Sequence, residues 1–300
     1  MVLVPEVVRN KALATGDEAW LDGLDAMLAD LADEWGLTTG ASIEGGTEAV
    51  VLEATMRSGR EAVLKVLVPR DGTNAREEAA VLAECGGRGC AELLRFDGSR
   101  SALLIERLGP SMFDGEVPYE ERLPILIATA AAVWRPPGEL GDLLVDGRTK
   151  AEWLVEFIEV EWERLDRPCS RAAVDDAVSS ARRRARAHDP DRAVLCHGDV
   201  HQWNALRAAS GWKLVDPDGV IAEPECDLGI ILREDPEELM ARDPAALVAD
   251  VARRTGTDPG AIWDWAFAER VSTGLVATGI ELQPVGRHML AAADALAATA

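Results

Sequence analysis

A polar turn between two apolar segments carries the residues best suited to chemistry. The turn follows the apolar run 193–196 and holds His197, Asp199 and Asn204, and a second apolar segment then leads to Asp216. A carboxylate such as Asp199 can accept the proton of an attacking hydroxyl group. The amide oxygen of Asn204 and the carboxylate of Asp216 are hard oxygen ligands, which suit Mg²⁺. The Asp-x4-Asn spacing, with a further Asp at a strand end, predicts phosphoryl transfer.

This order of residues is similar to two segments of protein kinases, which read H-R-D-x4-N and D-F-G. Here Gly198 stands in the place of the Arg, and Pro217 follows Asp216. Both departures indicate a kinase of small molecules. The alternative is a polar loop that happens to precede a strand-end Asp, but that interpretation leaves the spacing and an upstream lysine unexplained.

That lysine, Lys65, lies in the alternating run AVLKVLV. We expect its side chain to leave the sheet core for a cleft and to hold the α- and β-phosphates of a nucleotide. A carboxylate of the following helix must then fix its position, and Glu77 and Glu78 are both available. The alternative is an edge-strand lysine that faces water.

Two residues are expected to support the catalytic turn without taking part in chemistry. His197 would organise the loop by hydrogen bonding to backbone near Asp216. Asp227 precedes the start of a buried helix in EPECDLGIIL. We expect it to cap that helix and to brace the turn through backbone N–H groups.

The elements that must position these residues predict an α+β fold in two lobes. In the N-lobe, residues 1–108, the patterns predict an antiparallel sheet of five strands with one inserted helix at 74–85, preceded by an amphipathic helix at 17–36. The turn at Gly45-Gly46 would let backbone approach the phosphates, unless it serves only as a turn. The C-lobe, 109–300, is mainly helical, with helices predicted at 151–165, 170–188, 236–255 and 258–300 and a loop at 135–150.

Composition and charge restrict the possible partners. The chain has 300 residues, 48% of them hydrophobic, and a formal net charge of −22. This charge repels nucleic acid and anionic membranes, and it would attract a cationic small molecule, although it would also serve solubility alone. Five cysteines without a CxxC pair predict neither a disulfide framework nor a zinc site. No signal peptide or membrane-spanning run is recognisable, so we expect a cytoplasmic location.

Several motifs in series give the chain its resemblance to a known family. They are AVLKV, EEAAVLAECGGRG, LLIERLGP, CHGDVHQWNAL, GWKLVDPDG and EPECDLGIILRED. The chain resembles the aminoglycoside phosphotransferase family, in its streptomycin 6-kinase and hydroxyurea phosphotransferase branch. The resemblance implies a bilobal, protein-kinase-like fold that transfers the γ-phosphate of ATP or GTP, with Mg²⁺, to a substrate hydroxyl.

The resemblance also implies roles for individual residues. Asp199 becomes the catalytic base, Asn204 and Asp216 the Mg²⁺ ligands, and Lys65 the phosphate-binding lysine. Counting back from GGRG favours Glu78 over Glu77 as the partner of Lys65. Backbone between Glu106 and Leu108 would face the adenine edge. One departure is Asp218, where the branch often has a lysine, and this leaves the exact substrate open.

Acidic residues of the C-lobe bind ammonium or guanidinium groups in this family through charge-assisted hydrogen bonds. The sequence does not choose among five candidates: Glu223, Glu225, Asp264, Glu269 and Glu281. The leading hypothesis is an antibiotic resistance kinase of streptomycin or a related aminoglycoside. A kinase of hydroxyurea or another small alcohol is the first alternative, and a catalytically silent nucleotide-binding module is the second.

Overall fold

The computed structural model describes residues 3–43, 48–69 and 74–298, and it divides into two compact units. The first comprises residues 1–109 and 207–215, and the second comprises 110–206 and 216–300. Each unit is described by itself below. The predicted turn at Gly45 and Gly46 lies outside the described residues.

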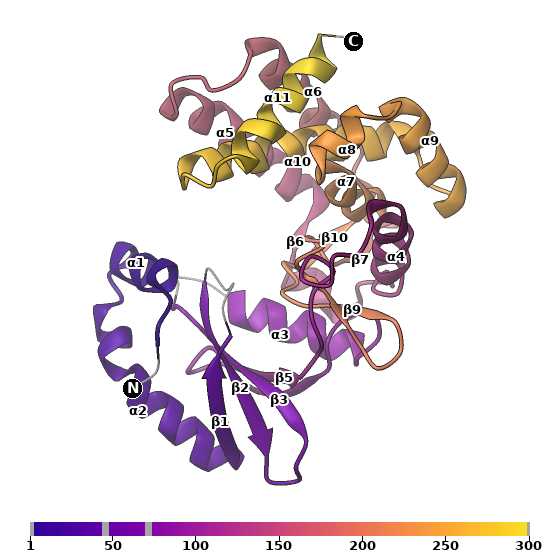
Figure 1. Cartoon of the computed structure of the whole chain (residues 1–300). Helices are drawn as coiled ribbons and strands as arrows, with labels where there is room; N and C mark the ends of the chain where they lie inside the picture. Colours follow the sequence, from indigo (N-terminus) through magenta and orange to yellow (C-terminus); the bar gives the residue numbers. More distant parts are fainter. Residues whose placement is uncertain (1–2, 44–47, 70–73, 299–300) are drawn as a thin grey trace. The chain divides into compact units, whose positions relative to one another are not determined.

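The first unit is built on an antiparallel sheet (Figure 1). Its spatial order is β1-β2-β3-β5-β4, so β3 is the central strand. Lys65 lies on β3 between Val51 of β2 and Leu103 of β5. The alternative of an edge-strand lysine is therefore wrong. The strand bounds are β1 Leu37–Ser42, β2 Ala49–Met56, β3 Glu61–Leu67, β4 Leu93–Asp97 and β5 Ala102–Glu106.

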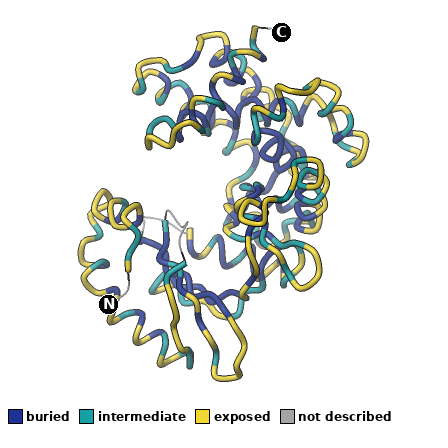
Figure 2. Tube along the Cα trace, in the orientation of Figure 1, coloured by how far each residue is buried: buried dark blue, intermediate teal, exposed yellow. Residues whose placement is uncertain are grey.

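Three helices accompany this sheet: α1 Glu6–Thr15, α2 Glu18–Trp35 and α3 Asn74–Cys85. The predicted helix 17–36 corresponds to α2, which buries Trp20, Leu24, Leu28 and Leu31 at helical spacing. These residues share one core with α1 and with sheet residues such as Leu52. Strands β3 and β5 are mostly buried, as the dark blue colour in Figure 2 shows, whereas β1 is mostly exposed. The short helix α1 was not predicted from the sequence.

The second unit is mainly helical and contains a small sheet of order β6-β10-β7. The helix α10 is buried along most of its length, and with α5 and α6 it forms the core of this unit. The bounds of the strands are β6 Val145–Asp146, β7 Val194–Cys196 and β10 Val220–Ala222, and those of the first helices are α4 Tyr119–Ala131, α5 Gly147–Arg164, α6 Arg171–Ala187 and α7 Glu225–Arg233. The later helices are α8 Pro236–Met240, α9 Pro244–Thr255, α10 Pro259–Gly279 and α11 Val285–Ala297. Strands β8 Ala205–Arg207 and β9 Trp212–Leu214 pair separately.

Three predicted boundaries in this part of the chain were wrong. The predicted helix 236–255 is two helices, because Asp243 caps α9 by accepting the N–H groups of Ala245 and Ala246 and Pro244 begins it. The predicted helix 258–300 is likewise divided into α10 and α11. The predicted loop 135–150 holds a 3-10 helix, strand β6 and the start of α5. The α+β class itself is confirmed, and none of the described helices is long and apolar enough to cross a membrane.

Candidate active site

Two paired strands bring the two predicted catalytic segments together in the second unit. Strand β7 ends at Cys196, and β10 begins at Val220, directly opposite Cys196 in the antiparallel pair. The loop that starts at His197 therefore lies beside the segment that ends at Gly219. The N–H of Gly219 donates to the carbonyl of His197 at 2.9 Å. This pairing places the segments of Asp199 and Asp216 next to each other.

The glycine at position 198 is required by its conformation and by its neighbours. Gly198 has a φ of +87°, in the region that favours glycine. A Cβ added there would lie 3.0 Å from Cβ of Asp218 and 3.1 Å from Cγ2 of Val220. Any larger side chain would displace the turn. This explains why the turn has Gly at position 198.

The side chain of Asp227 holds the catalytic turn by accepting hydrogen bonds from the backbone of that turn. Its carboxylate accepts the N–H groups of His197 at 3.0 Å and Gly198 at 2.9 Å, and also the indole N–H of Trp134 at 2.9 Å. Asp227 is fully buried. The predicted capping role was wrong, because α7 begins at Glu225 and Asp227 lies within its first turn.

His197 is buried and serves the loop as a hydrogen-bond acceptor. Its Nδ1 accepts the N–H of Asp199 at 3.3 Å. Burial lowers the pKa of the His197 imidazole, although the nearby Asp227, Asp199 and Asp216 act in the opposite direction. A neutral ring that carries no proton on Nδ1 is the form this contact requires.

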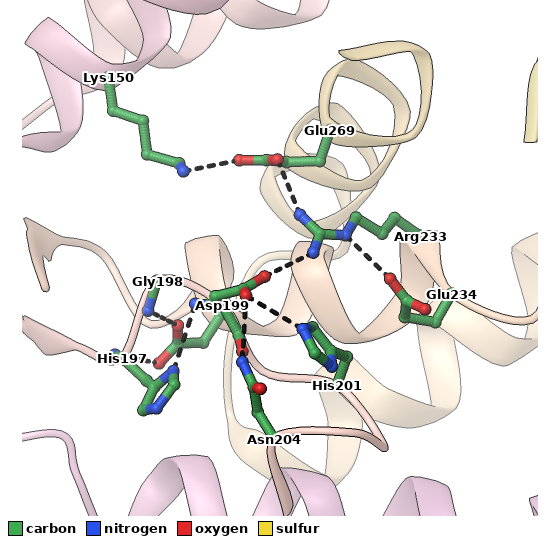
Figure 3. A network of polar contacts seen from close by, with 10 residues as sticks. Lys150, His197, Gly198, Asp199, His201, Asn204, Arg233, Glu234 and Glu269 are labelled. Carbon is green, nitrogen blue, oxygen red and sulfur yellow. Dashed lines mark hydrogen bonds and ion pairs between the residues drawn. The ribbon is translucent and has the colours of Figure 1, made fainter. Parts of the chain in front are cut away.

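Three side chains surround the carboxylate of Asp199 (Figure 3). Oδ2 lies 3.0 Å from Nε2 of His201 and accepts from Nδ2 of Asn204 at 3.1 Å. Oδ1 accepts from Nη2 of Arg233 at 2.7 Å. Burial by itself would raise the pKa of the Asp199 carboxyl, but the charges and hydrogen bonds of His201 and Arg233 outweigh it and hold that pKa below its ordinary value. Asp199 is therefore an ionised acceptor at neutral pH.

The sequence did not identify two of these neighbours. His201 was not among the predicted site residues, but its side chain is only 16% exposed and contacts Asp199. Arg233 ends helix α7, in which every residue is buried. A cation that follows the apolar run GIIL needs acidic partners, and this was the available signal.

Asn204 is oriented as a cation ligand would have to be. Its Nδ2 donates to the backbone carbonyl of Asp199 and to the Asp199 carboxylate, both at 3.1 Å. This fixes the amide nitrogen toward Asp199 and leaves Oδ1 as the end that can meet Mg²⁺. Asp216 is exposed, and its φ of +56° is unusual for a residue with a side chain. Among the described residues, no cluster of three or more His, Cys, Asp or Glu forms a preassembled metal site.

In the first unit, Lys65 forms an ion pair with Glu78. The Lys65 Nζ lies 2.7 and 2.9 Å from the two carboxylate oxygens, and the side chains are 9% and 6% exposed. An ammonium held in this way keeps a fixed position on the central strand β3.

The segment predicted to face adenine follows β5. The N–H of Glu106 donates to the carbonyl of Glu92 at 2.9 Å. Its side chain accepts the N–H of Glu92 and pairs with Lys213. Leu108 is buried. The backbone N–H and one carboxylate oxygen of Glu106 are thus already engaged within the first unit.

Of the five acidic candidates for substrate binding, three are neutralised within the protein. Glu223 accepts from Arg184 and from the indole of Trp265. Asp264 is buried between Arg183 and Arg184. Glu269 is buried between Lys150 and Arg233. Carboxylates already paired with internal cations have little to offer a cationic ligand. This pairing disfavours the three as substrate contacts, and their assignment stays a prediction.

The other two candidates differ from each other in exposure. Glu225 is buried and accepts the N–H of Asp258 at 2.8 Å, while its Oε2 has no hydrogen-bond partner among the described residues. Glu281 is exposed and follows the end of α10. Both stay predictions.

The chain is similar in sequence to known proteins. Residues 34–278 match the model of a family described as aminoglycoside/hydroxyurea antibiotic resistance kinase. The chain is 28% identical to streptomycin 6-kinase of Streptomyces griseus over 98% of this chain and 97% of the relative. It is 32% identical to hydroxyurea phosphotransferase of Kitasatospora aureofaciens over 72% of this chain and 62% of the relative.

Solved structures show the same fold at low sequence identity. A thermostable mutant of the aminoglycoside phosphotransferase APH(4)-Ia, in ternary complex with ADP and hygromycin B, aligns with a TM-score of 0.62 at 16% identity. The alignment covers 90% of this chain and 97% of that chain. The predicted protein-kinase-like fold is confirmed. The chain therefore belongs to the aminoglycoside/hydroxyurea antibiotic resistance kinase family, whose members are phosphotransferases acting on hydroxyl groups.

Proposed function

We propose that this protein transfers the γ-phosphate of ATP, with Mg²⁺, to a hydroxyl group of streptomycin or a related aminoglycoside. The observation that carries this proposal is the contact between Asp199 and Asn204 within one turn. It presents an ionised carboxylate and, beside it, an amide whose oxygen end is left for a cation. These are the groups that phosphoryl transfer to an alcohol requires.

Each residue then has a distinct task. Asp199 orients the acceptor hydroxyl and receives its proton as the oxygen attacks the γ-phosphorus. Because the pKa of Asp199 is lowered, its main contribution is position, and the proton moves as the P–O bond forms. Asn204 and Asp216 would hold Mg²⁺, which neutralises charge on the phosphates. Lys65, fixed by Glu78, would bind the α- and β-phosphates.

The choice of acceptor rests on the relatives and on charge. The streptomycin 6-kinases of Streptomyces griseus and Streptomyces glaucescens align with 98% and 76% of the chain, and hydroxyurea phosphotransferase aligns with 72% of it. Streptomycin is also a cation, and a protein with a net charge of −22 attracts cations. Hydroxyurea lacks that charge and is the second candidate. A catalytically silent module is disfavoured because Lys65, Asp199, Asn204 and Asp216 are all present.

The test is a panel of acceptors in an assay of ADP release with Mg²⁺–ATP. Streptomycin, other aminoglycosides and hydroxyurea are compared at equal concentration, and the product is examined by mass spectrometry for one added phosphate. We expect turnover with streptomycin or an aminoglycoside. Turnover with hydroxyurea alone would replace the proposed substrate. ATP binding without turnover of any acceptor would refute the proposed antibiotic substrate.

A further inference from the structure

Four charged side chains form a chain of alternating sign that ends on Asp199 (Figure 3). Lys150 Nζ lies 2.9 Å from Oε1 of Glu269, and Oε2 of Glu269 accepts from Nη1 of Arg233 at 3.1 Å. Nη2 of the same guanidinium donates to Oδ1 of Asp199 at 2.7 Å. The four residues come from α5, α10, the end of α7 and the catalytic loop.

Every nitrogen of the Arg233 guanidinium group donates a hydrogen bond. Its Nε donates to Glu234 at 3.1 Å, so three nitrogens meet three different carboxylates. The side chain is only 10% exposed. Because the guanidinium is planar and rigid, two of these contacts suffice to fix the direction in which Nη2 points. Asp199 therefore receives a donor whose orientation is set by Glu234 and Glu269.

Burial makes this arrangement sensitive to each charge. The side chains of Glu269 and Lys150 are 5% and 13% exposed. A buried carboxylate that loses its cation is strongly disfavoured. Lys150 thus balances Glu269, and Glu269 in turn balances the cation that contacts Asp199.

We propose that Glu269 is a positioning residue for phosphoryl transfer, which holds Arg233 so that Arg233 fixes the Asp199 carboxylate by its Oδ1 oxygen. Lys150 completes the assembly by neutralising the far oxygen of Glu269. This inference rests on the proposed function, since it assigns a step to Asp199. It gives Glu269 a role different from the substrate contact that its acidity suggested.

The kinetic test compares Glu269→Gln and Arg233→Lys with wild type. Both variants disturb the guanidinium fork and leave the Asp199 side chain itself unsubstituted. We expect kcat to fall about tenfold to a hundredfold, because small displacements of a catalytic group have effects of that size. KM for ATP and for the acceptor should change little. A variant Glu269→Gln with the wild-type kcat would overturn the inference.

The matched control is Arg184→Lys. Arg184 is also a buried arginine that bridges two acids, with Glu223 at 3.2 Å and Asp264 at 3.0 Å, and its side chain is 12% exposed. Among the residues that the structure describes, it makes no hydrogen bond or ion pair with Asp199. We expect this variant to lose stability while its kcat stays at the wild-type value. If kcat falls as far in Arg184→Lys as in Arg233→Lys, a general loss of stability would explain the lower kcat of both variants. The positioning role would then be refuted.

Chemical rescue separates positioning from a merely structural role. In Arg233→Ala, added guanidinium ion at concentrations below those that unfold proteins should restore part of the lost kcat. The same ion should leave Asp199→Asn inactive, because that variant lacks the group to be positioned. Absence of rescue in a folded Arg233→Ala protein would count against the proposal.

A structural experiment needs no turnover, so it tests this inference independently of the proposed function. If the wild type transfers phosphate to none of the acceptors, the proposed function is wrong, and crystal structures of wild type and Glu269→Gln still decide the geometry. We expect the contact between Arg233 and Asp199 to be lost or rearranged in the variant. An unchanged contact would overturn the inference. If Glu269→Gln fails to fold, Glu269→Asp, which keeps the charge and shortens the reach, replaces it.

Discussion

The carboxylate of Asp227 accepts the backbone N–H of Gly198 at 2.9 Å, across 29 residues of sequence. With its second oxygen it accepts the N–H of His197. The start of helix α7 is thus joined directly to the turn that carries Asp199. Both N–H groups are buried, and Asp227 supplies a hydrogen-bond acceptor to each of them.

Replacing Asp227 with Asn should disturb this turn. An amide has one acceptor oxygen, and its NH₂ group would face a backbone N–H, so a buried hydrogen bond is lost. We expect the free energy of unfolding to fall by about 1–3 kcal/mol and kcat to fall with it, as measured by denaturant titration and steady-state kinetics. The control is Asp97→Asn, which alters a turn of the first unit where Asp97 accepts the N–H groups of Ser99 and Arg100. It should leave kcat unchanged. Equal kcat in Asp227→Asn and wild type would show that the turn holds without Asp227.

Helix α7 should tolerate no side chain at Gly229. A Cβ there would lie 2.4 Å from Cβ of Trp265 and 2.7 Å from the backbone nitrogen of Ala266 on α10. Gly229→Ala should therefore lower the free energy of unfolding by about 1–3 kcal/mol or more, since the backbones must separate. Gly23→Ala on α2 is the control, because a Cβ at Gly23 meets nothing within 4 Å. At Gly23 the same substitution should raise the free energy of unfolding by about 0.5–1 kcal/mol. Thermal unfolding of both variants checks the pair, and a stable Gly229→Ala protein would contradict the packing.

The ion pair of Lys65 and Glu78 allows stability and function to be separated. Lys65→Met leaves Glu78 buried without this cation, which should cost about 3–5 kcal/mol in the free energy of unfolding. The double variant Lys65→Met/Glu78→Leu should recover much of that stability, because neither charge remains. Activity should stay low in both, with a raised KM for ATP. A double variant with normal KM and kcat would exclude Lys65 from nucleotide binding.

The metal assignment predicts a strict requirement for Asp216. Asp216→Ala should abolish turnover that depends on Mg²⁺, since a carboxylate ligand is lost. Asn204→Ala should lower the same Mg²⁺-dependent turnover. Titration of Mg²⁺ at saturating ATP would show a raised requirement for the metal. Activity and Mg²⁺ dependence that match wild type in Asp216→Ala would mean that the ligand has been misassigned.

The elements that could be predicted from the sequence are those in which the local spacing of apolar and polar residues indicates which side chains are buried. The stripe from Trp20 to Leu31 marked α2 because one face of it is buried. Lys65 was recognised because it interrupts an apolar strand. In contrast, the division between α8 and α9 depends on a cap at Asp243 within a segment that otherwise reads as one helix.

The acidic residues of the second unit could not be assigned from the sequence. Whether Asp264 is available to a ligand depends on Arg183 and Arg184, which lie 81 and 80 residues earlier. Glu269 likewise depends on Lys150 from another helix. Local spacing carries no information on such distant partners, so buried and exposed carboxylates look alike until the fold is known.

The most direct test of the account is transfer of labelled γ-phosphate from ATP to streptomycin by wild type and by Asp199→Asn. This substitution keeps the size of the side chain and removes the proton acceptor. We expect label on streptomycin with wild type, and a rate lower by about a hundredfold to ten-thousandfold in the variant, with the Kd for Mg²⁺–ATP unchanged. Label transferred at the wild-type rate by Asp199→Asn would contradict the role of Asp199, on which the proposed mechanism depends.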